Sequence, residues 1–206
     1  MKRKRQRRAG TYRTPDARSR AARAEGFVAR SVYKLEEIDR RLRLLKQGQH
    51  VLDLGAAPGS WVQYALSRIG KGGRLLAIDL QPLKVSLSEP NCFLQVDALE
   101  LPVEALEMFA PYDVVLSDMA PSTTGDRRTD KIRSNELFLR ALELSDPLLR
   151  PGGSFVAKVF MSGEFPEIRE AVRKRFETIR TLRPETVRSS SYEVFVAGLG
   201  RRQNAL

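Results

Sequence analysis

The sequence predicts an α/β protein with a seven-stranded, mostly parallel β-sheet, one antiparallel strand and helices on both faces. Three observations predict it. Apolar runs of strand length alternate with helical patterns along most of the chain. A length of 206 residues with 42% hydrophobic residues is sufficient for one domain with a sizeable core. The run Val51–Leu54 also passes through a glycine-containing turn into a helical pattern that begins at Ser60.

A helix is expected before the first strand. From Val32 to Leu45 the apolar residues recur at spacings of three and four, and Gly48 then ends the pattern. Lys34 falls on the rim of this apolar stripe, where it can reach toward whatever the helix packs on. Strands are then predicted at 51–54, 74–79, 92–96, 112–118, 153–160, 178–183 and 191–198. Helices are predicted at 60–69, 103–110, 130–148 and 166–176, with a poorly patterned connection at 81–90.

The last two predicted strands differ from the others because no helix separates them. They are joined by a loop that contains Pro184. Parallel neighbours need a long crossover connection, whereas antiparallel strands do not. One of the two is therefore expected to run antiparallel to the rest of the sheet.

The charge of the chain is concentrated at its start. The formal net charge is +11, and residues 1–30 hold eleven Lys and Arg against two acids, while residues 31–206 hold 25 against 23. We therefore expect a basic arm over 1–25, disordered or a frayed helix, and a folded domain over 26–206. Such an arm favours a polyanion such as a nucleic acid. An anionic membrane is the weaker alternative, because no stretch approaches the roughly 18 apolar residues that spanning requires.

The start of the chain and its single cysteine favour a cytoplasmic protein. Met1–Arg5 is not followed by an apolar segment of the kind a secretory signal needs, although an organelle transit peptide stays open. Cys92 is the only cysteine, which excludes an intrachain disulfide and suits a reducing compartment. His50 and Cys92 stand alone, so no metal site is expected.

The turn at 55–59 is typical of a nucleoside site. Gly55 and Gly59 let a ligand approach the backbone, and about 20 residues later Asp79 ends the next predicted strand, where a carboxylate can accept both ribose hydroxyls of an adenosine. The turn lacks a third glycine, which disfavours a pyrophosphate. A phosphate-free adenosine such as S-adenosyl-L-methionine fits better. The alternative is a structural turn with an incidental acid after the next strand.

Three charged residues interrupt strands that should be apolar. Lys158 lies within 153–160, Glu193 within 191–198, and Asp118 ends 112–118, at the edge where open α/β sheets bind ligands. Lys and Glu are rarely buried without a partner. They either line a site together with Lys34, or form a structural Lys158–Glu193 ion pair with Asp118 as a cap.

These motifs resemble the FtsJ family of heat-shock ribosomal RNA methyltransferases, which transfer methyl from S-adenosylmethionine to a ribose 2′-hydroxyl. The resemblance runs from about Glu25 to Gly200. It is carried by the stretches 26–35, 53–61, 117–121 and 151–160, which include Asp53-Leu54-Gly55-Ala56-Ala57-Pro58-Gly59 and Ser117-Asp118-Met119-Ala120-Pro121.

The resemblance implies a Rossmann-like methyltransferase fold and a role for each site residue. The family's catalytic Lys-Asp-Lys-Glu set falls on Lys34, Asp118, Lys158 and Glu193, with Lys158 as the general base. Lys34 and Glu193 would orient the ribose. Cofactor contacts are expected at Gly55, Gly59, Trp61, Asp79, Asp97 and Asp118. The implied substrate is a uridine of 23S rRNA within the 50S subunit, and a monomer is the default state.

Three positions depart from the family pattern. Ser60 stands where a third glycine is frequent, Ala29 replaces a common serine, and Tyr192 stands where a basic or small residue is frequent. None of them removes a catalytic group. The arm is also unusually rich in arginine.

Several alternatives stay open at this point. The RNA could be a tRNA or a cap, and a non-catalytic RNA-binding module could share the fold. A nicotinamide-dependent oxidoreductase is disfavoured by the short turn. Trp61 could simply pack in the core. Basic residues that could contact RNA lie in two groups: Arg127, Arg128, Lys131 and Arg133, and Arg169, Arg173, Lys174, Arg175, Arg180 and Arg183.

Overall fold

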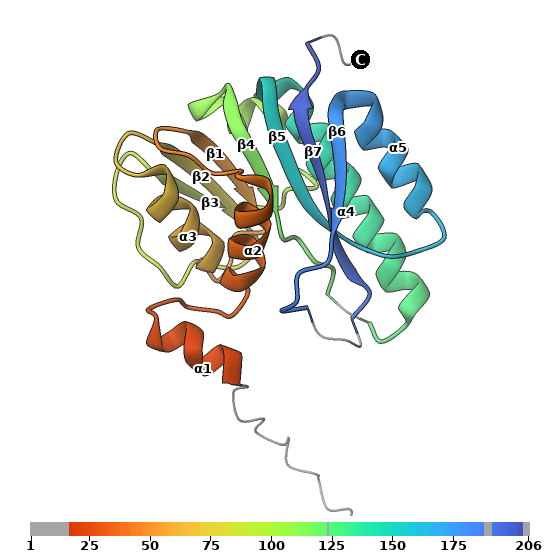
Figure 1. The fold of residues 1–206 in the computed structure, drawn as a ribbon, viewed down its shortest axis with the longest axis horizontal. Helices are drawn as coiled ribbons and strands as arrows, with labels where there is room; N and C mark the ends of the chain where they lie inside the picture. The colour runs from red at the N-terminus through yellow and green to blue at the C-terminus, as the bar shows by residue number, and fades with distance from the viewer. Residues whose placement is uncertain (1–16, 123, 188–190, 204–206) are drawn as a thin grey trace, which may run out of the picture.

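The structure is a computed structural model that describes residues 17–122, 124–187 and 191–203. A seven-stranded sheet with the order β3-β2-β1-β4-β5-β7-β6 runs through its centre (Figure 1). The strands are β1 (His50–Leu54), β2 (Arg74–Asp79), β3 (Cys92–Gln95), β4 (Tyr112–Ser117), β5 (Leu149–Phe160), β6 (Phe176–Leu182) and β7 (Glu193–Arg201). This confirms the predicted seven-stranded α/β fold.

The antiparallel strand is β7. It pairs antiparallel with both β5 and β6, whereas every other pairing in the sheet is parallel. The short connection between the last two strands thus places them side by side, as the missing crossover helix predicted.

Helices cover both faces of the sheet. Helices α2 (Val32–Leu42) and α3 (Ser60–Ile69) pack on one face, where Leu35, Ile38 and Trp61 meet Val51 and Phe195. The helices η1 (Val103–Phe109), α4 (Arg127–Leu148) and α5 (Phe165–Arg175) cover the other face around Phe138, Phe155 and Phe176. The core therefore consists of two apolar layers, one on each side of the sheet.

Some boundaries differ from the prediction. The first helix of the domain ends at Leu42 rather than at 45, because Arg43 adopts a left-handed conformation with φ 52°. The segment 103–109 is a 3₁₀ helix. In the expected arm, Ala17–Ala24 form the helix α1, with Ala22 buried. Residues 1–16 of that arm lie outside the described residues.

The strand ends that carry the predicted site residues lie at one edge of the sheet. Parallel strands β1, β2, β4 and β5 end there, and the antiparallel β7 begins there, with Glu193 opposite Phe160 in the register. Open α/β sheets bind their ligands at this edge. Among the described helices, none combines the length and the apolar character that a membrane crossing demands.

Candidate active site

Lys158 and Asp118 form a buried pair at the carboxyl edge of the sheet. The Lys158 Nζ donates to Asp118 Oδ1 at 2.9 Å and to the backbone oxygen of Asp118 at 2.6 Å. Lys158 lies on β5 and is only 6% exposed, and Asp118 follows the last residue of the adjacent strand β4. A buried ammonium without such a partner would cost several kcal/mol, so Asp118 compensates the charge.

Lys34 and Glu193 form a second pair. Lys34 Nζ lies 2.6 Å from Glu193 Oε1, and the side chains are 16% and 12% exposed. Lys34 projects from the first turn of α2, which packs on the sheet through Leu35 and Ile38, and its amine also lies 5.8 Å from the centre of the Phe195 ring. The packing of α2 thus carries Lys34 to the start of β7.

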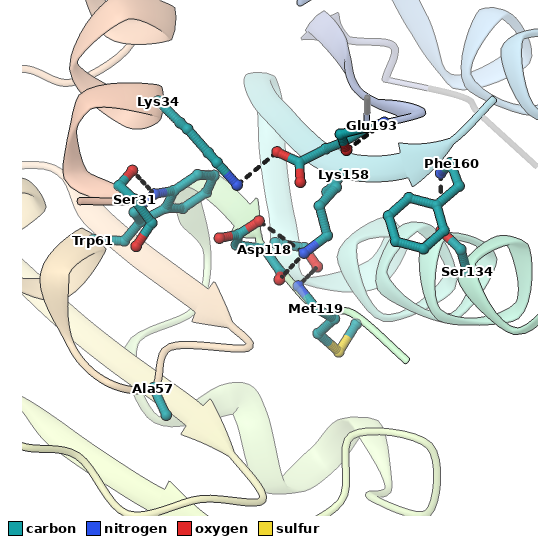
Figure 2. A network of polar contacts seen from close by, with 12 residues as sticks. Ser31, Lys34, Ala57, Trp61, Asp118, Met119, Ser134, Lys158, Phe160 and Glu193 are labelled. Carbon is teal, nitrogen blue, oxygen red and sulfur yellow. Dashed lines mark hydrogen bonds and ion pairs between the residues drawn. The ribbon is translucent and has the colours of Figure 1, made fainter. Parts of the chain in front are cut away.

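The two pairs converge on one place. Figure 2 shows the amines of Lys34 and Lys158 between the carboxylates of Glu193 and Asp118. The register explains this arrangement, because Lys158 lies opposite Phe195 and hence diagonal to Glu193 on the same face of the sheet. The structure brings together all four residues of the predicted set. It pairs Lys158 with Asp118, and not with Glu193 as the purely structural alternative required.

A pocket lies beside these pairs, at the ends of β1 and β2. Its empty space amounts to about 410 Å³, part of which is open solvent. Its lining combines two carboxylates with apolar walls, and consists of Gly55, Ile78, Asp79, Leu80, Val96, Asp97, Ala98, Met119, Ala120 and Leu137. A mainly apolar pocket with a few converging polar groups is typical of a small-molecule site.

Both carboxylates of the pocket are held by backbone groups. Asp79 Oδ2 accepts from the Ala57 N–H at 2.8 Å, and Oδ1 accepts from the Gln81 N–H at 2.7 Å. Asp97 Oδ1 accepts from the Leu99 N–H at 2.9 Å. A carboxylate has about four acceptor positions, so each can take further hydrogen bonds from a ligand.

Gly55 allows the pocket and the Lys158–Asp118 pair to lie next to each other. Its φ is +80°, and a Cβ at this position would lie 2.6 Å from the backbone nitrogen of Met119. The glycine thus lets the segment after Asp118 lie directly against the turn that follows β1. Gly59 precedes α3 and lies against Val85 instead, outside the lining of the pocket.

The side chain of Trp61 lies in the core. The residue is 2% exposed, its ring packs 5.8 Å from that of Phe195, and its Nε1–H donates to the backbone oxygen of Ser31 at 2.9 Å (Figure 2). The indole therefore holds the segment before α2 against α3. Trp61 does not line the pocket.

Asp53 is a polar residue of the site region that the sequence analysis missed. It is fully buried on β1, and neither carboxylate oxygen has a hydrogen-bond partner among the described residues. Burial raises the pKa of this carboxyl well above its usual value, and the negative charges of Asp118 and Asp79 raise it further. The signal was available, because Asp53 is a charged residue in an apolar strand just as Lys158 is.

Three of the other lining residues follow the acids directly in the chain, whereas Leu137 comes from the distant helix α4 and had no such signal. Leu80 follows Asp79, Ala98 follows Asp97 and Met119 follows Asp118. Their position after the carboxylate was the available signal. Within the described ranges, no group of three or more His, Cys, Asp or Glu side chains is arranged to hold a metal ion.

Two features define the class of the protein: the strand order with an antiparallel β7, and a pocket at the carboxyl ends of β1 and β2. This class is the Rossmann-like methyltransferases. A family model described as FtsJ-like methyltransferase matches residues 27–201. The chain belongs to this family and is a methyltransferase.

Curated relatives cover nearly the whole chain. One from Sorangium cellulosum, named ribosomal RNA large subunit methyltransferase E, is 56% identical over 93% of this chain and 90% of its own length. Another of the same name, from Bdellovibrio bacteriovorus, is 43% identical over 93% of this chain and 100% of its own length.

Solved structures show the same fold at low sequence identity. A ribosomal RNA methyltransferase from Plasmodium falciparum matches with a TM-score of 0.74 and 23% identity, and covers 85% of this chain and 98% of its own. Human methyltransferase-like protein 13, solved in complex with SAH, matches with a TM-score of 0.59 and 16% identity over 84% of this chain and 85% of its own. These likenesses confirm the predicted fold class.

Proposed function

We propose that the protein transfers a methyl group from S-adenosyl-L-methionine to the 2′-hydroxyl of a ribose in RNA, with Lys158 as the general base. The observation that carries the proposal is the buried Lys158–Asp118 pair, which lies with Lys34 and Glu193 beside a pocket that holds Asp79 and Asp97. The substrate we propose is a uridine of 23S rRNA in the assembled 50S subunit.

The pocket fits the adenosine part of the cofactor. Asp79 would accept the two ribose hydroxyls, and Asp97 would accept from the adenine amino group, with Leu80, Val96 and Ala98 as apolar walls. Asp118 would border the methyl-bearing end. When bound, the cofactor supplies an electrophilic methyl group on a sulfonium, so neither a metal nor a covalent enzyme intermediate is needed.

Lys158 is arranged to accept the proton of the ribose hydroxyl. In its neutral form the amine has two hydrogens and a lone pair. The two hydrogens match the two acceptors that Asp118 provides, Oδ1 and the backbone oxygen. The lone pair then remains for the 2′-hydroxyl proton. Asp118 would thus fix the direction of the lone pair and stabilise the ammonium that forms.

Lys34 and Glu193 would place the ribose. The carboxylate of Glu193 can accept a hydrogen bond from a sugar hydroxyl, while the Lys34 ammonium stabilises negative charge that develops on the attacking oxygen. Positioning of the hydroxyl and stabilisation of its charge would supply most of the rate enhancement. Both groups are held by an ion pair, so little reorganisation is required.

Two observations support RNA as the substrate. The relatives from Sorangium cellulosum and Bdellovibrio bacteriovorus are named as ribosomal RNA large subunit methyltransferases. The excess of positive charge over residues 1–30 favours a polyanionic partner. We propose that the protein acts as a monomer in the cytoplasm.

The test is methyl transfer to ribosomal subunits from a strain that lacks the enzyme. With tritiated S-adenosylmethionine, the label should enter the 23S rRNA of 50S subunits at one uridine, and the linkage after it should resist alkali because its 2′-oxygen is blocked. Transfer to tRNA but not to subunits would change the substrate. Tight RNA binding without transfer to any RNA would support a non-catalytic binding module and overturn the proposal.

A further inference from the structure

Tyr192 is an exposed aromatic residue directly before Glu193. The residue is 41% exposed, and two cations lie against its ring. Arg127 Cζ is 5.4 Å and Lys131 Nζ is 4.8 Å from the ring centre. We call Tyr192, Arg127 and Lys131 the tyrosine cluster. Its members join the start of β7 to the first turns of α4.

The tyrosine cluster is fixed to the same edge of the sheet as the catalytic residues. The Tyr192 carbonyl accepts from the Met161 N–H at 2.9 Å, and the Phe160 N–H donates to Ser134 Oγ at 2.9 Å, which ties β5 to α4. Figure 1 shows that α4 and β7 begin at the same end of the sheet. The cluster thus lies on the α4 side of Glu193, whereas Lys34 lies on the α2 side.

The acids near the tyrosine cluster are already engaged. Asp126 caps α4 by accepting from the backbone of Arg128 and Thr129, and Asp130 accepts from Thr124. The pKa of Glu164 is lowered mainly by its own backbone N–H, then by the Ser162 hydroxyl, with smaller effects of Arg128 and Lys131. Among the described residues, neither Arg127 nor Lys131 makes an ion pair with an acid, so both can bind an anion.

We propose that the tyrosine cluster holds the nucleotide next to the methylated one, with its base stacked on the Tyr192 ring and its phosphate bound by Arg127 and Lys131. This proposal rests on RNA being the substrate. Unpaired bases of RNA stack on aromatic rings and on arginine, and lysine and arginine bind phosphate. Both cations end long side chains, so either can leave the ring for a phosphate while the base takes its place.

The choice of nucleotide follows from the position of the cluster. Glu193 would contact the ribose that is methylated, and Tyr192 is the residue directly before it in the chain. When that ribose lies at Glu193, the adjacent nucleotide of the strand is the one nearest to the cluster. Single-stranded RNA therefore fits the cluster better than a base-paired helix, whose bases offer no free face.

A fluorescent oligoribonucleotide tests the stacking directly. A short single strand with 2-aminopurine beside the uridine should lose fluorescence on binding the wild type, and Tyr192→Ala should abolish the quenching and weaken affinity about tenfold. Tyr192→Phe and Tyr192→Trp should keep both. Arg127→Ala/Lys131→Ala should lower the slope of log affinity against log salt by about 0.7, since the two cations bind one phosphate and each phosphate neutralised in a single strand contributes about 0.7.

The control is a pair of exposed cations at the opposite edge of the sheet. Lys71 precedes β2, and Arg202 follows the antiparallel β7. Lys71→Ala/Arg202→Ala removes the same net charge and should leave the quenching unchanged and the salt slope close to that of the wild type. Thermal unfolding of each variant shows whether it is folded.

Three results would overturn the proposal. The first is quenching in Tyr192→Ala as strong as in the wild type, and the second is a loss of quenching and affinity in Tyr192→Phe as large as in Tyr192→Ala. The third is a salt slope that falls as much in Lys71→Ala/Arg202→Ala as in Arg127→Ala/Lys131→Ala. The binding assay needs no methyl transfer, so its outcome is independent of catalysis. If catalysis on 50S subunits is present, Tyr192→Ala should also raise KM for the subunit about tenfold and leave kcat and cofactor affinity unchanged.

Discussion

At the scale of single residues, the arrangement of charge around Lys158 connects stability with chemistry. A lysine that is 6% exposed needs a carboxylate, and Asp118 provides it at 2.9 Å. The same two hydrogen bonds that make burial of the amine tolerable also fix its orientation. The residue that compensates the charge is therefore also the one that aims the base.

Asp53 gives a prediction at the same scale. Burial and the charges of Asp118 and Asp79 raise its pKa in the folded protein well above the ordinary 3.8. The folded protein therefore holds a proton that the unfolded chain has lost, and the free energy of unfolding decreases as pH rises above that value. Asp53→Asn lacks this decrease, so relative to the wild type it should gain stability steadily from about pH 4, the pKa of an unfolded aspartate, up to the raised pKa of the folded protein.

Urea unfolding across this pH range checks the prediction. Glu104→Gln is the matched control, because Glu104 is an exposed carboxylate of η1 that does not line the pocket. It should follow the wild-type pH profile. A difference between Asp53→Asn and wild type that stays constant over pH would mean that Asp53 does not take up a proton on folding.

At the scale of elements, the site depends on how closely the segment after β4 approaches the turn after β1. Gly55→Ala should disturb it in two ways: the new Cβ would lie 2.6 Å from the Met119 backbone nitrogen, and φ is +80°. Gly48→Ala provides the matched control, because Gly48 has φ +79° and nothing within 4 Å of the Cβ position.

The two alanine variants distinguish the cost of a positive φ from the effect of moving the segment that follows Asp118. Gly48→Ala should cost about 1–2 kcal/mol of stability through its backbone conformation alone and keep full methyl transfer. Gly55→Ala should cost more and should slow methyl transfer by about a hundredfold, because Met119 adjoins Asp118. Denaturant unfolding and single-turnover rates measure the two effects. Equal rates in the two variants would contradict the role given to this contact.

At the scale of the whole molecule, the charge distribution predicts how RNA affinity depends on salt. Residues 1–16 hold seven Lys and Arg and one acid. Removal of these residues should reduce the slope of log affinity against log salt by up to about 5 and leave the thermal unfolding of the domain unchanged. Filter binding at several salt concentrations measures the slope. An unchanged slope would show that this segment makes no phosphate contacts.

Much of the fold could be predicted from the sequence because its signals are local. The strand β2 and the helix α3 have the predicted bounds, since each has a clear period and an obvious end. The end of α2 could not be predicted, because Leu44 and Leu45 stay buried after the helix has ended and therefore extend its apolar pattern.

The set of four site residues was also predictable, but their pairing was not. Charges in or at the end of predicted strands identified Lys158, Glu193 and Asp118, the rim of a helical stripe placed Lys34 near them, and the family resemblance joined the four into one set. Lys158 and Glu193 are diagonal neighbours in the sheet, so the strand register alone would also allow them to pair. Which acid each lysine contacts depends on the directions of the side chains, which the sequence does not reveal. Trp61 shows the same limit: its helix position was compatible with either the core or the pocket, and packing against Phe195 decides for the core.

The most direct measurement is the single-turnover rate of Lys158→Ala with saturating S-adenosylmethionine and 50S subunits. Loss of the general base should reduce methyl transfer by about a thousandfold or more, while affinity for cofactor and subunit stays within a few-fold of the wild type and the variant remains folded. A rate close to that of the wild type would contradict the account, because the proton of the ribose hydroxyl would then have another acceptor than Lys158.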